Sequence, residues 1–237
     1  LGRTVTVGGM AKGAGMIHPN MATLLAMIVT DAVATAPVLD AILRRAVSRS
    51  FNAISVDGDT STNDTLLLLA NGQAGHQALE DVAAPAAAAL ADAVTAVAVH
   101  LAQAIVRDGE GASRFVTIIV RGAYDDVDAH RAAEAIARSP LVKTAIYGGD
   151  PNWGRVLCAV GYSGAQVDPA KAALWFDDVA LVRDGRPLDY DEARAAEVLR
   201  RPEVVLTVDL GLGTGEATLW TCDLTHKYVD INAHYRT

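Results

Sequence analysis

The sequence is short of cysteine, aromatic residues and basic residues, and each shortage narrows what the chain can do. Only 2 of its 237 residues are cysteine, 5% are aromatic, and 20 Lys and Arg stand against 28 Asp and Glu, for a net charge of −8. This excess of acid argues against a broad basic surface for nucleic acid. Cys158 and Cys222 lie in apolar segments without CxxC spacing. We therefore expect two buried free thiols in preference to a disulfide or a metal site.

Long uninterrupted hydrophobic runs are also missing, although 51% of the residues are hydrophobic. The longest Ala/Val-rich segment, residues 82–106, is broken by Pro85, Asp92 and His100. This predicts a buried helix and no membrane span. The net charge of −8 favours a soluble cytoplasmic protein. The N-terminus has neither an initiator Met nor the layout of a signal peptide, and it begins within a strand-like pattern. We expect the chain to be a fragment or a processed piece of something longer.

Strand-like and helix-like segments alternate along a chain long enough for one or two domains. Apolar or β-branched runs predict strands at residues 5–7, 24–30, 53–56, 65–70, 115–120, 204–210 and 217–222. Helical spacing predicts helices at 37–51, 78–107, 126–138 and 191–200. Residues 211–215 are expected to turn the last two strands into a hairpin. The order predicts an α/β fold with mixed or antiparallel sheets.

The most specific chemical signal is Thr23, at the head of an apolar strand. It follows the constrained segment Lys12-Gly-Ala-Gly-Met-Ile-His-Pro-Asn-Met-Ala-Thr23. If the preceding bond were cut, Thr23 would carry both a hydroxyl nucleophile and a free α-amine. Because an α-amine titrates near ~7.7–8, it can take the hydroxyl proton without help from His or Asp. The bland interpretation is an ordinary threonine that begins a strand.

Three other motifs favour structural interpretations. Asp57-Gly-Asp-Thr-Ser-Thr-Asn-Asp64 starts like a calcium loop, but Thr62 takes the glycine position and Leu68 the position of the bidentate Glu. A loop of Asx and Ser/Thr turns is favoured there. Gly13-Ala-Gly15 is not a dinucleotide fingerprint. Ser163 misses the nucleophile-elbow pattern because Ala165 replaces its last glycine.

Residue patterns alone also favour structure over chemistry in the second half of the chain. Asp108-Gly-Glu-Gly111 is typical of a helix-ending turn, although its glycines would let Glu110 approach an ammonium ligand. Asp150-Pro-Asn-Trp-Gly-Arg155 is typical of a turn that starts a helix. The C-terminal residues would ordinarily fray beyond Ile231.

These motifs together resemble one enzyme family. Gly8 to Thr23, Val56 to Asp64, Ala104 to Gly111, Asp150-Pro-Asn-Trp-Gly-Arg-Val-Leu and Ile231 to Thr237 resemble, in order, segments of the bacterial ornithine acetyltransferases (glutamate N-acetyltransferases). The resemblance covers the chain from end to end. It implies the layered helix–sheet sandwich of the ornithine acetyltransferase/DmpA-like type. It also implies that residues 1–22 end an N-terminal (alpha) subunit and that residues 23–237 form the C-terminal (beta) subunit.

The resemblance implies a reaction and a set of residues. Thr23 would attack the Ala22 carbonyl and split the precursor at Ala22–Thr23, and would then carry acetyl from N2-acetylornithine to glutamate. The positions that match substrate-holding residues of the family are Lys12, Thr23, Glu110, Asn232 and Thr237. No cofactor or metal is implied. The family's oxyanion donors are a Thr-Gly pair of the N-terminal subunit, outside this sequence, so we expect the chain alone to be nearly inactive.

The resemblance also implies partners. We expect the missing N-terminal subunit, a heterotetramer of two alpha and two beta chains, and neither nucleic acid nor membrane. Family members differ in whether they accept acetyl-CoA as a donor. Two other hypotheses stay open: a self-processing amidase or aminopeptidase that passes the acyl group to water, and an inactive, partner-dependent subunit.

Overall fold

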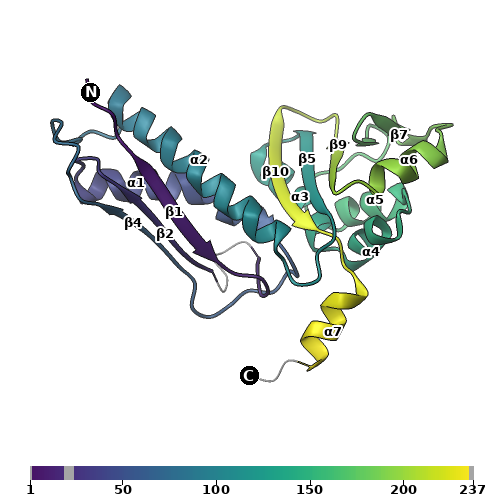
Figure 1. The fold of residues 1–237 in the computed structure, drawn as a ribbon. Helices are drawn as coiled ribbons and strands as arrows, with labels where there is room; N and C mark the ends of the chain where they lie inside the picture. The colour runs from purple at the N-terminus through teal and green to yellow at the C-terminus, as the bar shows by residue number, and fades with distance from the viewer. Residues whose placement is uncertain (1, 19–23, 235–237) are drawn as a thin grey trace. The chain divides into compact units, whose positions relative to one another are not determined.

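The computed structural model describes residues 2–18 and 24–234, which form two compact units divided after Ile105. Three predicted site residues, Ala22, Thr23 and Thr237, lie outside the described residues. Helices pack on mixed sheets in both units (Figure 1). The predicted α/β class with mixed sheets is therefore confirmed.

The first unit contains a three-stranded sheet in the order β1-β2-β4. β1 is antiparallel to β2, and β2 is parallel to β4. The elements in chain order are β1 (Val7–Lys12), β2 (Leu25–Thr30), α1 (Ala36–Ser48), η1 (Phe51–Ala53), β3 (Ile54–Ser55), β4 (Thr65–Ala70) and α2 (Pro85–Arg107).

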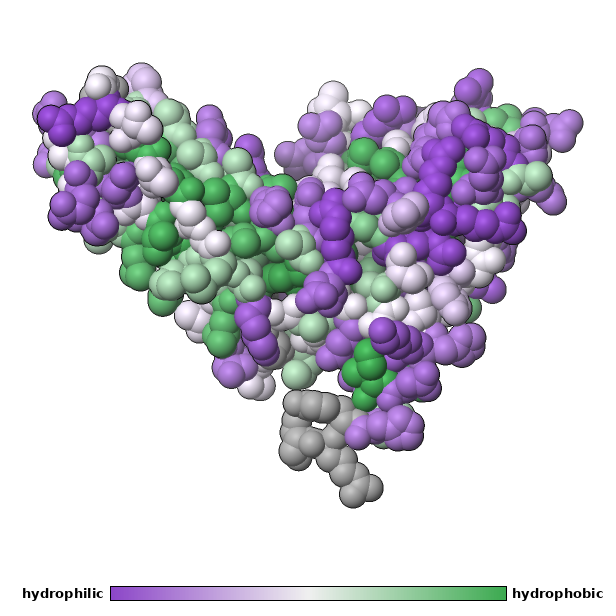
Figure 2. All heavy atoms as spheres, in the orientation of Figure 1, coloured by the Kyte–Doolittle hydropathy of each residue, from purple (hydrophilic) through white to green (hydrophobic). Residues whose placement is uncertain are grey.

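The strands of this sheet alternate between a covered and an open face. Ala26, Ile28 and Thr30 of β2 are buried, whereas the residues between them are partly or largely exposed. The open face carries five exposed large apolar side chains, which the space-filling view shows as a hydrophobic area over the sheet (Figure 2): Met10, Leu25, Val29, Leu67 and Leu69. The covered face meets the helices, because a Cβ added at Gly9 would lie 3.0 Å from Leu101 and 3.2 Å from Val97 of α2.

Helix α2 is the chain's longest helix among those described, at 23 residues. By length and composition alone this helix could cross a membrane, because its most apolar window has a mean hydropathy of 1.7. The interruptions in the sequence had predicted no such segment. Its buried positions, among them Ala87, Leu90, Val94 and Ala98, recur every three to four residues. This spacing and the contacts with Gly9 are those of a helix packed on a core, as predicted.

The second unit surrounds a larger sheet in which β10-β5-β9-β6-β7-β8 are neighbours. β5 is antiparallel to β10 and parallel to β9. Helix α3 lies against β5 and β10. The elements are β5 (Phe115–Ala123), α3 (Asp126–Arg138), α4 (Pro140–Gly148), α5 (Trp153–Gly161), β6 (Ala173–Phe176), β7 (Val179–Arg183), β8 (Arg186–Pro187), α6 (Glu192–Leu199), β9 (Glu203–Asp209), β10 (Gly215–Cys222) and α7 (His226–His234).

Three predictions in this unit are wrong. Strands β9 and β10 do not form a hairpin, because β5 lies between them and pairs with both. Cys158 is exposed on α5 and not buried, whereas Cys222 is buried as expected, and the two cysteines form no disulfide with each other. The tail does not fray at Ile231, since α7 continues to His234 and so contains Asn232.

Candidate functional site

Lys12 is the last residue of β1, and it lies at the end of the first unit's sheet where β2 begins with Leu25, two positions after Thr23. In the strand register Lys12 is opposite Leu25, and Leu25 is opposite Thr65. Directly opposite residues project from the same face of a sheet. These three side chains help to line a shallow groove of about 330 Å³ on the open face. The predicted cation therefore stands beside the strand residue two positions after Thr23.

The loop between β3 and β4, residues 56–64, is tied to the chain on both sides of the predicted cleavage point. Asp57 accepts hydrogen bonds from the amides of Met16 at 2.7 Å and Ile17 at 3.1 Å. Asp64 Oδ1 accepts from the Leu24 amide at 2.6 Å. Asp57 also accepts from Asp59 N, and Ser61 from Asn63 N. The loop is built from Asx and Ser/Thr turns as predicted, and its acids fix the chain at residues 16–17 and 24.

Asp64 is unusual among these acids. Its Oδ2 atom is buried and has no hydrogen-bond partner among the described residues. Burial raises the pKa of Asp64 above its usual value, and the hydrogen bond from Leu24 N–H only partly opposes this. The sequence pattern predicted only a structural loop for Asp64. Asp64 directly precedes strand β4, and the sheet fixes the position of a residue there. This position in the sequence could have indicated that Asp64 has a defined partner.

The second unit brings together two of the predicted substrate residues. Glu110 follows α2 in a tight turn, and Asn232 lies on the last turns of α7. Asn232 Nδ2 donates a hydrogen bond to Glu110 Oε2 at 2.8 Å and another to the Tyr228 carbonyl at 3.0 Å. Glu110 is half-buried and Asn232 is exposed. The pair offers carboxylate and amide oxygens to a ligand that brings positive charge or N–H donors.

This pair is held by contacts at the start of α7. Thr225 Oγ1 donates to the Gly111 carbonyl at 2.7 Å. Gly111 has φ +72°, and a Cβ there would lie 2.5 Å from Tyr228 N. Asp223, whose side chain is fully buried, accepts from the amides of Ser113 and Arg114 and pairs with Arg114 Nη1 at 3.1 Å. The glycine and the acid therefore fix the Glu110 turn against the helix that carries Asn232.

Of the predicted site residues, the structure brings Glu110 and Asn232 together in the second unit, whereas Lys12 belongs to the first. The remaining motifs are structural where they are described. Asn152 caps α5 by accepting from Arg155 N at 3.2 Å, as the turn-and-helix interpretation predicted. Ser163 donates to the Val160 carbonyl at 2.7 Å and so closes the end of α5.

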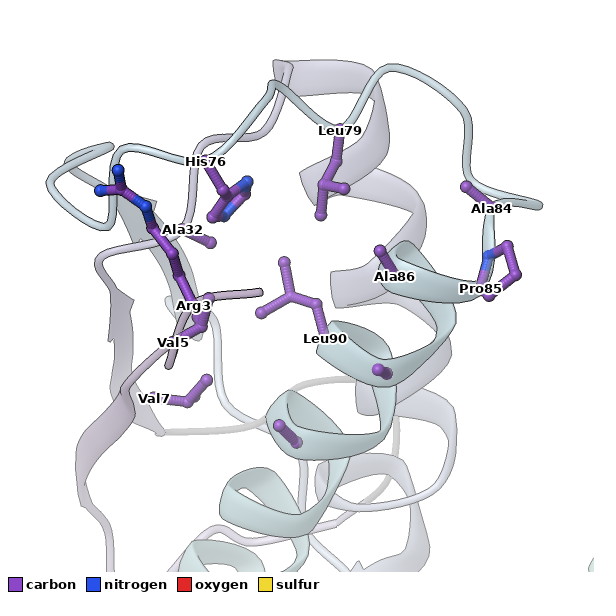
Figure 3. A pocket seen from close by; sticks show the side chains of 12 residues that line it. Arg3, Val5, Val7, Ala32, His76, Leu79, Ala84, Pro85, Ala86 and Leu90 are labelled. Carbon is purple, nitrogen blue, oxygen red and sulfur yellow. The ribbon is translucent and has the colours of Figure 1, made fainter. Parts of the chain in front are cut away.

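A cavity of about 680 Å³ lies at the other end of the first unit (Figure 3). Val7 lines it, and Val7 and Lys12 are the two ends of β1, about 17 Å apart at the usual rise per residue. His76 at its edge is satisfied, since its Nε2 accepts from Val33 N and its Nδ1 bonds the Gln77 carbonyl. The cavity is therefore separate from the groove beside Lys12.

The fold is that of a mixed α/β protein with helices layered on two sheets. Comparison with known proteins identifies the family of this α/β protein. The profile of the ArgJ family matches residues 1–237. The chain belongs to the ArgJ family.

Its relatives carry names from arginine biosynthesis. It is 56% identical over 236 residues to the arginine biosynthesis bifunctional protein ArgJ of Symbiobacterium thermophilum, and 55% identical over 233 residues to that of Geobacter sulfurreducens. It covers 58% and 59% of their lengths, so it spans under two thirds of these relatives. A relative named mitochondrial, from Schizosaccharomyces pombe, is 50% identical.

A solved structure supports the fold. The crystal structure of arginine biosynthesis bifunctional protein argJ from Bacillus halodurans matches with a TM-score of 0.85 at 38% identity. The match covers 88% of this chain and 98% of that one.

Proposed function

We propose that the protein containing this chain transfers the acetyl group of N2-acetylornithine to glutamate through an acetylated Thr23. The observation that carries the proposal is the end of the β1-β2-β4 sheet. There Lys12 stands opposite Leu25, and two acids hold the amides of residues 16, 17 and 24 around the expected cleavage point. The family membership and the names of the relatives support the same reaction.

Self-cleavage would come first and would prepare the nucleophile. The Thr23 hydroxyl attacks the Ala22 carbonyl, the Ala22–Thr23 C–N bond breaks, and water hydrolyses the resulting ester. Residues 1–22 would then end one subunit and residues 23–237 would form the other.

Acetyl transfer would follow in two half-reactions. The Thr23 α-amine takes the hydroxyl proton while the oxygen attacks the acetyl carbonyl, and ornithine leaves with the proton on its nitrogen. The amine of glutamate then attacks the threonine ester and removes the acetyl group. Lys12 suits the α-carboxylate of the substrates, and Glu110 with Asn232 suits the side-chain ammonium of ornithine. The Thr237 carboxylate is proposed as a further substrate contact.

The assembly and the setting of the enzyme are part of the proposal. Oxyanion donors would come from the N-terminal subunit, and the whole enzyme would be a cytoplasmic heterotetramer of two alpha and two beta chains. Acetyl-CoA as a second donor is a separate question, to be answered with the same assay.

The experiment compares the full-length protein with its Thr23→Ala and Thr62→Ala variants, since Thr62 is an exposed threonine in the acidic loop. Each is incubated with a labelled donor, either acetyl-labelled N2-acetylornithine or acetyl-labelled acetyl-CoA, and then with glutamate or with water alone. We expect cleavage before Thr23, label on the peptide that begins with Thr23, and discharge by glutamate. Thr23→Ala should lose cleavage and at least ~10³-fold in transfer rate. Discharge by water as fast as by glutamate would instead identify an amidase.

A further inference from the structure

Both N–H groups of the Asn232 side-chain amide are used inside the second unit. Nδ2 donates one hydrogen bond to Glu110 Oε2 at 2.8 Å and another to the Tyr228 carbonyl at 3.0 Å. An amide nitrogen has two N–H groups to donate, and a carboxylate and a carbonyl can only accept. Turning the amide over would therefore lose both bonds and bring oxygen against oxygen. The two neighbours fix which way the Asn232 amide points.

This arrangement leaves two acceptor atoms available at the pair. Within the described residues, Glu110 Oε1 and Asn232 Oδ1 accept no hydrogen bond, and Glu110 forms no salt bridge. Asn232 is exposed and Glu110 is half-buried, so a ligand can reach both side chains. The pair thus presents two free oxygens and one uncompensated negative charge, and it presents no free amide N–H.

Two free oxygens on separate groups suit a primary ammonium better than a guanidinium. An ammonium has three N–H groups that point in different directions, so its single nitrogen can bind acceptors on two side chains. A guanidinium is planar and binds best where one carboxylate offers both oxygens to two parallel N–H groups. At Glu110 one of these two oxygens already accepts from Asn232.

We propose that Asn232 is a specificity residue, which makes this pair select a primary ammonium over a guanidinium. It does so by occupying Glu110 Oε2 and by presenting its own Oδ1 to the ligand. The inference rests on the proposed function and deepens it, because the side chain of ornithine ends in an ammonium. Arginine has the same three methylenes before a guanidinium, so it is the ligand that the pair must distinguish from ornithine.

Removing the Asn232 amide should change the two affinities in opposite directions. In Asn232→Ala both oxygens of Glu110 become available to a guanidinium, whereas an ammonium loses the Oδ1 acceptor. Alanine favours the helical conformation at this exposed position, so α7 keeps its propensity to form. Damage to α7 or to the Glu110 turn would instead weaken both ligands together. The direction of the two changes therefore separates a specificity role from a merely structural one.

The test is isothermal titration calorimetry of the full-length protein with ornithine, lysine, arginine and citrulline. No acetyl donor is present, so no transfer takes place. Lysine carries an ammonium on a chain one methylene longer and controls for length, and citrulline is neutral and controls for charge. In the unmodified protein arginine should bind at least ~10-fold more weakly than ornithine, which corresponds to the loss of one hydrogen bond to a charged group.

Asn232→Ala should remove this preference, with Asp230→Ala, which changes an exposed acid of the same helix, as the matched control. An exposed ion pair distinguishes little between cations, so the arginine and ornithine affinities of Asn232→Ala should lie within about threefold of each other. The ratio of lysine to ornithine affinity should not change. Asp230→Ala should keep both ratios of the unmodified protein.

Three results would overturn the inference: no measurable binding of ornithine to the unmodified protein, equal binding of ornithine and arginine to it, or an unchanged ratio in Asn232→Ala. If Asn232→Ala does not accumulate as folded protein, Asn232→Leu carries the test, because leucine has a similar shape and no polar atom. It should also remove the preference, and an unchanged ratio would overturn the inference.

The proposed function is tested separately on the same preparations with acetyl-labelled N2-acetylornithine. Protein that prefers ornithine but takes no label on Thr23 would remove the acetyl transfer and keep the ammonium preference of the pair. Protein that takes the label but binds ornithine and arginine equally would remove only the role of Asn232.

Discussion

The side-chain amide of Asn232 donates a hydrogen bond to Glu110 Oε2 at 2.8 Å, across 122 positions of sequence. It joins the turn after α2 to an exposed helix that buries none of its residues. An exposed helix has little packing to hold it, so contacts at its first turn decide where Asn232 lies. The predictions that concern this pair therefore test the turn as well as the side chains.

Glu110→Gln should weaken substrate binding without stopping self-cleavage. The change keeps an acceptor for Asn232 but removes the charge proposed to meet the ornithine ammonium. A hydrogen bond to a charged group contributes about 1.5–3 kcal/mol, which corresponds to a 10- to 10²-fold rise in KM for N2-acetylornithine. Steady-state kinetics and intact mass measure the two effects. Glu216→Gln, an exposed acid of the same unit, is the control and should leave both unchanged.

Gly111→Ala should be more harmful than Gly164→Ala. Both glycines have positive φ, +72° and +80°, so alanine pays the left-handed backbone cost of about 1–2 kcal/mol at each. Only at Gly111 does the new Cβ meet backbone, 2.5 Å from Tyr228 N, while Gly164 has nothing within 4 Å. We expect a lower melting temperature for both and a raised KM for Gly111→Ala alone. Equal KM values would contradict the role assigned to this turn.

Gly9→Ala and Gly8→Ala should differ although they are neighbours on β1. A Cβ at Gly9 would lie 3.0 Å from Leu101 of α2 and 3.0 Å from the Met27 carbonyl, whereas Gly8 has nothing within 4 Å. Overpacking of this kind costs about 1–3 kcal/mol. Gly8→Ala should be neutral or slightly stabilising, because it restricts the unfolded chain. Urea unfolding measures both, and a Gly9→Ala protein as stable as Gly8→Ala would show that α2 adjusts freely.

Asp223→Asn should destabilise the second unit far more than Glu203→Gln. The Asp223 side chain is 0% exposed and that of its partner Arg114 is 15% exposed, so the change leaves a buried charge without its counter-charge. Breaking such a pair costs about 3–5 kcal/mol. The pair of Arg107 with Glu203 is 42% and 64% exposed, and contributes only about 0.2–1 kcal/mol. Thermal unfolding at matched ionic strength would settle the order, and similar melting temperatures would contradict it.

Local sequence patterns predicted those helices and strands whose bounds are set by neighbouring residues. Strand 65–70 and helix 126–138 have the predicted bounds, since an apolar run and an N-capping Asp125 define them. The helix predicted from residue 78 begins instead at Pro85, where proline suits the first turn. The pairing of β5 between β9 and β10 depends on contacts distant in sequence, and the apparent hairpin turn hid it.

The site followed the same division. Residue patterns alone predicted that Glu110 lies in a turn and that Asn232 lies in a frayed tail. Only the family resemblance predicted that both residues belong to one substrate site. Their hydrogen bond forms because α7 packs against Gly111. No local sequence pattern predicts this contact. The hydrogen bond that Asp64 accepts from the Leu24 amide was not predicted for a related reason, because the two residues are 40 positions apart in the sequence.

The register of β1 with β2 has a consequence for the proposed cleavage. Residues 7–12 lie before the Ala22–Thr23 bond and residues 25–30 after it, yet the two strands pair at six successive positions. Scission would cut the covalent connection and leave this ladder whole. The two products would stay interleaved in one sheet, would co-elute in native buffer, and would come apart only in denaturant.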